Sequence, residues 1–257
     1  MTPLLAALLL GAPLPLQAEA ERALPRESAG ALMDVASGRL LALVGPDDLV
    51  RKAHAPGSLM KLVTAWAALR ADLGTRTFDC NGTDVHRGRT RSCWRRDGHG
   101  RLGMRQALSD SCDVWFYRMA RLLGPARLLE AARTLGLGRP TGSDVEGEAA
   151  GAPAIRARVG VREDWEELVR ALRDAVQSGT GAAAGDLPIA GKTGTAPVAG
   201  QEEPLAWFAG FAPDDAPQVA VVTFVPEGLG SRDAAAAAAD LVRVYFQWRD
   251  RQGPAGR

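Results

Sequence analysis

Apolar and polar positions alternate near both ends of the chain, as in β-strands, whereas apolar residues recur at helical spacing in the middle. Residues 29–44 form two alternating runs around a turn at Ser37-Gly38, which is typical of a β-hairpin. Three later runs are also strand-like: 187–196, 205–211 and 219–225. The pattern predicts one mainly antiparallel five-stranded sheet that is built from both chain ends.

Helical periodicity occupies most of the rest. The apolar spacing predicts helices over residues 58–69, 108–123, 126–137, 163–177 and 233–248. The step Gly124-Pro125 separates the second helix from the third. Residues 74–103 are rich in glycine and arginine and have little periodicity. Residues 138–161 are rich in glycine, alanine and proline, so we expect a long connection there. A sheet covered by helices, with an inserted helical region, makes an α+β fold.

Composition and charge fit an ordinary globular protein. The chain has 257 residues, of which 46% are hydrophobic and 24% charged, and its net charge is +1. The arginines are scattered along the sequence, so we expect neither a nucleic acid nor another polyanion as a partner. We expect a single domain over residues 21–250 and a flexible tail at 251–257.

The first twenty residues differ from the rest. Residues 4–16 are apolar, and Ala18-Glu19-Ala20 places small residues at the spacing of a signal-cleavage site. The run is short for a membrane span, and no lysine or arginine precedes it, unlike most signal peptides. We expect export to the periplasm or cell envelope with cleavage after Ala20. An uncleaved membrane anchor and a cytoplasmic protein are the alternatives.

Ser58 and Lys61 begin the first predicted helix, directly after Pro56-Gly57. Residues three apart share one face of a helix, and free backbone N–H groups at a helix start favour developing negative charge. A serine hydroxyl near an amine is therefore an arrangement for nucleophilic catalysis. An N-cap serine beside a surface lysine has the same spacing, so the pair needs support from elsewhere in the chain.

Two further polar groups interrupt elements that otherwise suit a protein core. Ser111-Cys112-Asp113 precedes the apolar run of a helix, and Lys192-Thr193-Gly194-Thr195 lies inside a predicted strand. Gly194 permits the close approach of a ligand backbone, and Lys192 can pair with a carboxylate. Taken alone, the second group is also explained by an edge strand that turns into a loop.

The three motifs together resemble a known family. Ser-x-x-Lys on a helix, Ser-x-Asp on a second helix and Lys-Thr-Gly-Thr on a strand are similar to the motif set of penicillin-binding proteins and class A β-lactamases. The segments ALMDVASGRLLALV, TGSDVEGEAAGAP and LAWFAGFAP resemble the transpeptidase domain of class B penicillin-binding proteins. CW…GHG…SCDVWFY, from Cys93 to Tyr117, resembles the elongation-type subgroup, where Asp replaces the Asn common elsewhere. The resemblance covers roughly residues 28–250.

The resemblance implies a β-lactamase/transpeptidase-like fold and a D,D-transpeptidase that acts on peptidoglycan stem peptides and binds β-lactam antibiotics. Ser58 would be the acylated nucleophile and Lys61 its base. Ser111 would relay a proton to the leaving amine, and Asp113 would hold Ser111 or Lys61 in place. No cofactor is implied for catalysis, and cell-wall elongation proteins are implied as partners.

The resemblance also implies how the substrate is bound. Lys192 and Thr193 would bind its carboxylate, next to Gly194. The backbone N–H groups of Ser58 and Thr195 would form the oxyanion hole, which usually contributes most in acyl transfer.

Two departures from the family bear on function. Fewer than forty residues separate Ala20 from Ser58, where large class B proteins have a membrane helix and a pedestal. Residues 154–164 replace several tens of residues that the family places beside the active site, so we expect a more open cleft. A D,D-carboxypeptidase, a class D-like β-lactamase and a non-catalytic penicillin- or peptidoglycan-binding module are the alternatives. The Glu-x-x-Leu-Asn loop of a class A β-lactamase is absent between Asp113 and Lys192.

All three cysteines lie close together in the sequence. Cys80, Cys93 and Cys112, with His99, form a complete donor set for structural zinc. Few apolar residues are available to hold the intervening loop, so we predict a zinc site that fixes the Ser111 loop. A Cys80–Cys93 disulfide with Cys112 buried and free is the alternative in an exported protein. The other histidines, His54 and His86, are expected on the surface.

Overall fold

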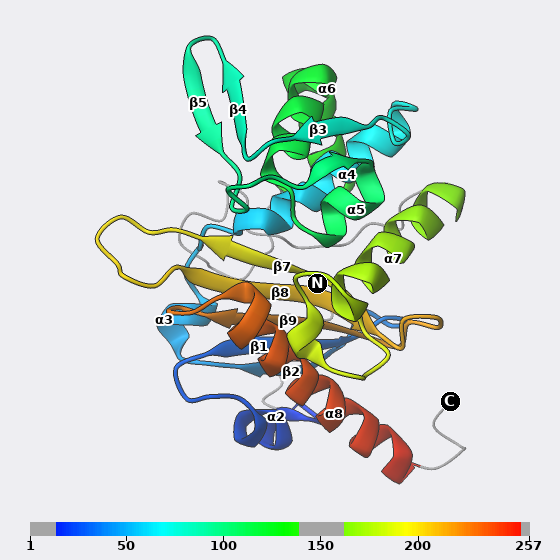
Figure 1. The fold of residues 1–257 in the computed structure, drawn as a ribbon. Helices are drawn as coiled ribbons and strands as arrows, with labels where there is room; N and C mark the ends of the chain where they lie inside the picture. The colour runs from blue at the N-terminus through cyan, green and yellow to red at the C-terminus, as the bar shows by residue number, and fades with distance from the viewer. Residues whose placement is uncertain (1–13, 139–161, 253–257) are drawn as a thin grey trace.

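A five-stranded sheet forms the centre of the computed structural model, which describes residues 14–138 and 162–252 (Figure 1). Its strand order is β2-β1-β9-β8-β7, and every neighbouring pair is antiparallel. The strands are β1 (Ala29–Asp34), β2 (Leu40–Val44), β7 (Ala190–Ala196), β8 (Leu205–Ala212) and β9 (Val219–Val225). Strand β1 from one chain end pairs with β9 from the other, which confirms the predicted α+β sheet.

One face of the sheet is covered by α8 (Ala235–Gln252) and α2 (Gln17–Ala23), which lie side by side in Figure 1. Leu16 and Ala20 have no solvent exposure and belong to the same core as Leu241 of α8. The Gln17 side chain bonds both backbone polar groups of Leu43, at 2.8 and 3.0 Å, and so occupies the edge of β2. The cleavage site expected after Ala20 therefore lies within a helix of the main core.

A helical lobe with its own core lies on the other side of the sheet (Figure 1). Its helices are α4 (Lys61–Arg70), α5 (Met104–Ser109), α6 (Asp113–Thr134) and α7 (Arg162–Gln177). The single helix predicted over 108–123 is wrong at its start, because the chain breaks between α5 and α6. The helix predicted over 126–137 continues α6 beyond a kink at Gly124, where φ is +76°. Ser111 therefore lies in a break between two helices.

The stretch 74–103 contains two small antiparallel ribbons that its lack of periodicity concealed. Their strands are β3 (Phe78–Cys80) with β6 (Gly100–Leu102), and β4 (Thr83–His86) with β5 (Arg89–Ser92). The remaining short elements are α3 (Asp47–Val50), η1 (Gly57–Met60), η3 (Ala182–Ala184) and η4 (Gly230–Ala234). Strands of three or four mostly exposed residues show no alternation for a sequence pattern to detect.

Three other expectations concern particular segments. His86 is exposed, as expected, but His54 is half-buried: its ring packs on Phe224 with centroids 4.5 Å apart. The surface assignment of His54 is therefore wrong, because a second apolar cluster on the sheet covers it. Most of the shortened stretch 154–164 lies outside the described residues. Among the described helices, none is both long enough and apolar enough to cross a membrane.

Candidate active site

Ser58 lies on the short 3₁₀ turn η1, which leads directly into α4. The turn is pressed against β7 at two glycines. A Cβ on Gly57 would lie 2.5 Å from the carbonyl oxygen of Thr195, and one on Gly194 would lie 2.6 Å from that of Pro56. Gly57 also has a φ of +54°, which favours glycine. The two glycines let the serine turn and the strand meet backbone to backbone.

Lys61 connects this turn to the second motif. The side chain is buried, and its Nζ donates to the carbonyl oxygen of Ser111 (2.7 Å), to Ser111 Oγ (3.0 Å) and to Asp113 Oδ1 (2.7 Å). These three bonds use all three N–H groups of an ammonium. The structure thus brings Lys61, Ser111 and Asp113 together, with the lysine directed at Ser111.

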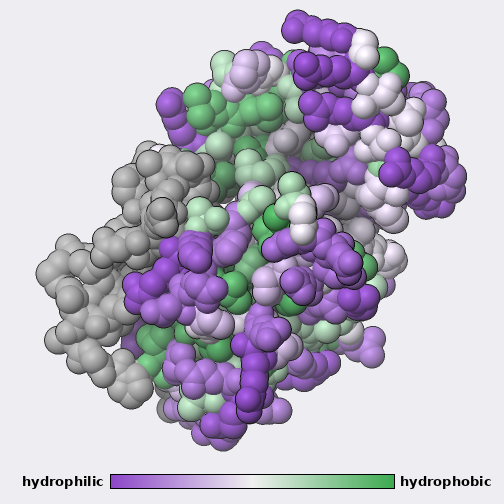
Figure 2. Space-filling model, turned by 90° about the vertical axis from the view of Figure 1, so that its left-hand side faces the viewer, coloured by the Kyte–Doolittle hydropathy of each residue, from purple (hydrophilic) through white to green (hydrophobic). Residues whose placement is uncertain are grey.

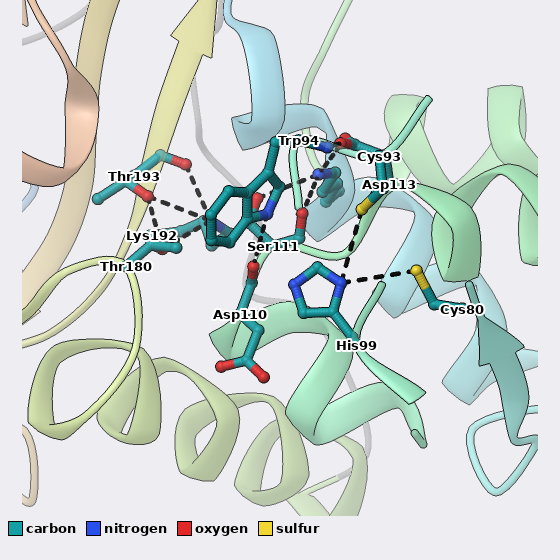
Figure 3. Close-up of polar contacts among 11 residues, drawn as sticks. Cys80, Cys93, Trp94, His99, Asp110, Ser111, Asp113, Thr180, Lys192 and Thr193 are labelled. Carbon is teal, nitrogen blue, oxygen red and sulfur yellow. Dashed lines mark hydrogen bonds and ion pairs between the residues drawn. The ribbon is translucent and has the colours of Figure 1, made fainter. Parts of the chain in front are cut away.

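Ser111 and Asp113 are set by the break between α5 and α6. Ser111 has a φ of +55°, in the left-handed region that non-glycine residues rarely occupy. Such strained residues cluster at functional sites. Asp113 begins α6, and its second oxygen, Oδ2, accepts the backbone N–H of Trp94 at 3.0 Å (Figure 3). The Trp94 indole N–H in turn donates to the Asp110 carbonyl oxygen at 3.0 Å.

Lys192 lies on β7 and is completely buried. Its Nζ donates to the carbonyl oxygen of Thr193 (3.0 Å), to Thr193 Oγ1 (3.3 Å) and to Thr180 Oγ1 (3.4 Å). The Thr193 hydroxyl donates to Thr180 Oγ1 at 2.8 Å (Figure 3). The Thr180 hydroxyl in turn donates to the Ser109 carbonyl oxygen at 3.3 Å. Burial, and then the nearby Lys61 ammonium, lower the pKa of Lys192 well below its usual range.

Sequence reasoning missed Trp94 and Thr180. Trp94 binds Asp113 through its backbone N–H, and nearly every residue type has such a group, so the sequence does not predict this contact. Thr180 follows the end of α7 at Ser178-Gly179, a signal that indicates only where the helix stops. Its partners lie 12, 13 and 71 positions away in the chain, so only the fold joins them.

The four predicted zinc ligands also converge beside this site, and Figure 3 shows three of them, Cys80, Cys93 and His99. Their ligand atoms all lie within 4.8 Å of one another, and the His99 Nδ1 is 3.6 Å from both Cys80 Sγ and Cys93 Sγ. A tetrahedral zinc ion with its usual bond lengths separates sulfur from nitrogen by about 3.6 Å. The three cysteines are free thiols in this structure. Burial lowers the pKa of His99, which favours the neutral imidazole that binds metals.

The chemistry available at the site is acyl transfer. A serine at a helix start, a buried amine hydrogen-bonded to a second serine, and a buried cation on the facing strand suit a substrate with a carbonyl group and a carboxylate. The predicted catalytic and substrate-binding residues lie on η1, the start of α4, the α5–α6 break and β7. The turn η1 packs directly on β7, and Lys61 joins the start of α4 to the α5–α6 break.

Known proteins resemble this chain in sequence and in fold. Peptidoglycan D,D-transpeptidase MrdA of Acinetobacter baumannii is 27% identical over an alignment of 290 residues in length. The alignment covers 79% of this chain and 42% of that protein. The chain thus spans less than half the length of that curated relative.

Two solved structures show the likeness of fold. The D,D-transpeptidase domain of a peptidoglycan glycosyltransferase from Eggerthella lenta has a TM-score of 0.75 at 22% identity, covering 93% of this chain and 82% of that one. Penicillin-binding protein PBP2 of Helicobacter pylori, solved in a complex with MreC, has a TM-score of 0.74 at 18% identity, covering 90% of this chain and 62% of that one.

The family described as "Penicillin binding protein transpeptidase domain" matches residues 29–161 and 155–243, which together make up most of the chain. The two matched segments meet at 155–161, within the stretch expected to be short relative to the family. The chain belongs to the penicillin-binding protein transpeptidase domain family.

Proposed function

We propose that the chain is an acyl-serine D,D-transpeptidase that acts on the D-Ala-D-Ala end of peptidoglycan stem peptides. One observation carries the proposal: Lys61 Nζ is held between Ser111 and Asp113, while the turn that bears Ser58 packs on the strand that bears Lys192. Family membership and the MrdA relative support the same activity.

In the proposed reaction, the Ser58 hydroxyl attacks the carbonyl carbon of the penultimate D-alanine, and Lys61 in its neutral form takes the proton. The new C–O bond replaces the peptide C–N bond, and the terminal D-alanine leaves as an amine that receives a proton through Ser111. An acceptor amine then attacks the ester and releases Ser58. Asp113 is a positioning residue, because it contacts Lys61 and not the reacting atoms.

The substrate carboxylate would supply Lys192 with a directly bonded negative charge, which no described residue provides. Lys192 is fully buried, yet in the described part of the chain its Nζ bonds only hydroxyl and carbonyl oxygens. A buried cation without a counter-charge is costly, and a carboxylate provides the strongest partner for it. We infer that Lys192 and Thr193 bind the terminal carboxylate, and that the N–H groups of Ser58 and Thr195 bind the oxyanion.

We also propose that Cys80, Cys93, His99 and Cys112 hold a structural zinc ion. The donor set is complete, the ligand spacing fits tetrahedral coordination, and His99 and the cysteines come from four separate points around the β3–β6 ribbon and α6. When bound, zinc would cross-link this loop to the start of α6. Metal analysis and thiol titration test it: stoichiometric zinc is expected, whereas no zinc with one free thiol would establish the Cys80–Cys93 disulfide.

Export to the cell envelope and a partnership with cell-wall elongation proteins belong to the same proposal. The substrate lies outside the cytoplasm, and the fold relative PBP2 of Helicobacter pylori has been solved in a complex with MreC. Fractionation, followed by cross-linking to the envelope proteins that co-purify, tests both statements.

The decisive experiment follows covalent labelling by a fluorescent penicillin over time. Stable labelling that is lost in Ser58→Ala and kept in Ser231→Ala, a change at an exposed serine, is the expected result. Transient labelling with turnover would instead indicate a class D-like β-lactamase, and no labelling would indicate a binding module. Release of D-alanine to water rather than to an amine acceptor would indicate a D,D-carboxypeptidase.

A further inference from the structure

The β4–β5 hairpin is a basic projection at the top of the helical lobe (Figure 1). It turns at Arg87-Gly88, where both φ values are positive, at +49° and +73°, as in a tight two-residue turn. The segment 85–96 contains five arginines and no acidic residue. Arginines are scattered over the rest of the chain, but this short stretch concentrates five of them on and directly after one hairpin.

A buried carboxylate anchors this hairpin to α6. Asp84 of β4 is 3% exposed, and it accepts bonds from Arg118 Nε at 3.1 Å and from both terminal nitrogens of Arg121, at 2.5 and 3.1 Å. The Arg91 guanidinium lies 5.5 Å from the centroid of the Tyr117 ring. These contacts fix the base of the hairpin. Because the Asp84 carboxylate is already paired with two arginines of α6, it does not neutralise the arginines farther along the hairpin.

The arginines beyond the anchor remain available to a ligand. Arg87, Arg89 and Arg96 are exposed, and none forms an ion pair with any described residue. Arg91 is also exposed but contacts Tyr117, and Arg95 pairs with Asp97 at 3.4 Å. Residues 74–103 have seven arginines and three aspartates, a net charge of +4, whereas the whole chain has +1. Hydrophilic residues accordingly dominate the top of the lobe in Figure 2.

The hairpin belongs to the same wall of the site as the catalytic pair. Strand β5 leads through Cys93 to Trp94, whose N–H binds the Asp113 carboxylate. Tyr117, which Arg91 contacts, follows Asp113 by about one turn of α6. A polymeric ligand that leaves the site along α6 would therefore meet these guanidinium groups.

We propose that the β4–β5 hairpin binds carboxylates of a peptidoglycan strand outside the active site. The proposal rests on the proposed function, because it assumes a polymer whose stem peptides carry repeated carboxylates. Guanidinium groups bind carboxylates with paired hydrogen bonds. Each exposed contact is weak, but several act together on a polymer. A membrane surface fits less well, because Val85, 66% exposed, is the only apolar side chain that the described hairpin strands offer.

Co-sedimentation of the full chain with purified peptidoglycan sacculi at low salt tests the proposal. Arg87→Glu/Arg89→Glu is expected to weaken binding roughly 2- to 30-fold. The matched control, Arg26→Glu/Arg39→Glu, changes two exposed arginines outside this lobe and is expected to bind normally. Sacculi with amidated carboxylates are expected to lose binding to the unmodified protein.

Three results would overturn the proposal: hairpin and control variants that bind alike, undiminished binding to amidated sacculi, or a hairpin-dependent affinity for anionic phosphatidylglycerol vesicles instead of sacculi. Penicillin labelling is expected to be equal in all these variants, because a small β-lactam does not reach the hairpin. Absence of labelling in the unmodified protein would count against the proposed activity. The comparison of sacculus binding between the hairpin variant and the control variant would still test the role of the hairpin.

Discussion

Thr180 joins the two sides of the active site, so it offers a sharp test of how the carboxylate-binding strand is positioned. Its hydroxyl accepts bonds from Thr193 Oγ1 and Lys192 Nζ and donates to the Ser109 carbonyl oxygen. Thr180→Val keeps the shape of the side chain and removes all three bonds. Thr180→Ser keeps the hydroxyl.

The magnitude follows from which groups lose their partners. Lys192 keeps its bond to the Thr193 carbonyl oxygen, and the Ser109 carbonyl oxygen still accepts the backbone N–H of Thr180 at 3.2 Å. The hydroxyl of Thr193, a residue that is 5% exposed, loses the acceptor described for it. One unsatisfied buried group costs about 1–3 kcal/mol, which corresponds to about a 5- to 150-fold loss of rate if the whole cost appears in the transition state.

The assay compares second-order acylation rate constants for a penicillin and for its carboxylate ester, together with melting temperatures. We expect Thr180→Val to slow acylation by the penicillin, Thr180→Ser to restore most of it, and the ester to be affected much less. Thr134→Val, which removes a hydroxyl bonded to Glu130 on α6, is the matched control and is expected to acylate normally. Equal slowing of penicillin and ester, or a fall in melting temperature with unchanged acylation, would refute a positioning role.

Three further expectations follow from other contacts. Asp113→Asn removes the charge 2.7 Å from Lys61 Nζ and is expected to slow penicillin acylation at least about tenfold, with circular dichroism showing that the variant is folded. Unchanged acylation would contradict the role of Asp113. Removal of zinc by a chelator, or His99→Ala, is expected to lower the melting temperature by several degrees, about 5 °C or more, while His86→Ala leaves it unchanged; equal melting temperatures for the two histidine variants would contradict a metal role. A chain that starts at Glu21 is expected to be about 2–4 kcal/mol less stable to urea than one that starts at Leu14, because it lacks buried Leu16; N-terminal sequencing of the exported protein shows which start is used.

The sequence predicted best the elements in which a long run of residues keeps one periodic pattern and buries a single face. Strands β8 and β9 and helix α7 occur within a residue of the predicted positions, because each spans seven or more residues with a buried face. An apolar, alanine-rich start fits a signal peptide and a packed helix equally well, so the sequence does not reveal that Leu16 and Ala20 pack in the core. Their burial depends on α8, more than two hundred residues later.

The contacts that complete the site could not be predicted from residue types. The resemblance of the motif set implied that Lys61 and Ser111 act together, but the chain break that gives Ser111 a positive φ has no sequence signature of its own. The anchor between Asp84 and Arg121 joins the non-periodic stretch 74–103 to helix α6, over a separation of 37 positions. Such pairs depend on how the helices and ribbons of the lobe pack against one another, and the local sequence pattern does not determine that packing.

Asp113 explains why the zinc cluster, the hairpin and the catalytic lysine share one wall of the site. One carboxylate oxygen binds Lys61, and the other binds the N–H of Trp94, which directly follows Cys93. Cys112 directly precedes Asp113. A proposed metal ligand is therefore the chain neighbour of Asp113 itself, and another is the chain neighbour of Trp94, which binds Asp113. With few apolar residues in the loop, the position of Lys61 depends on groups that a metal would fix, and that would couple metal binding to the rate of acylation rather than to stability alone.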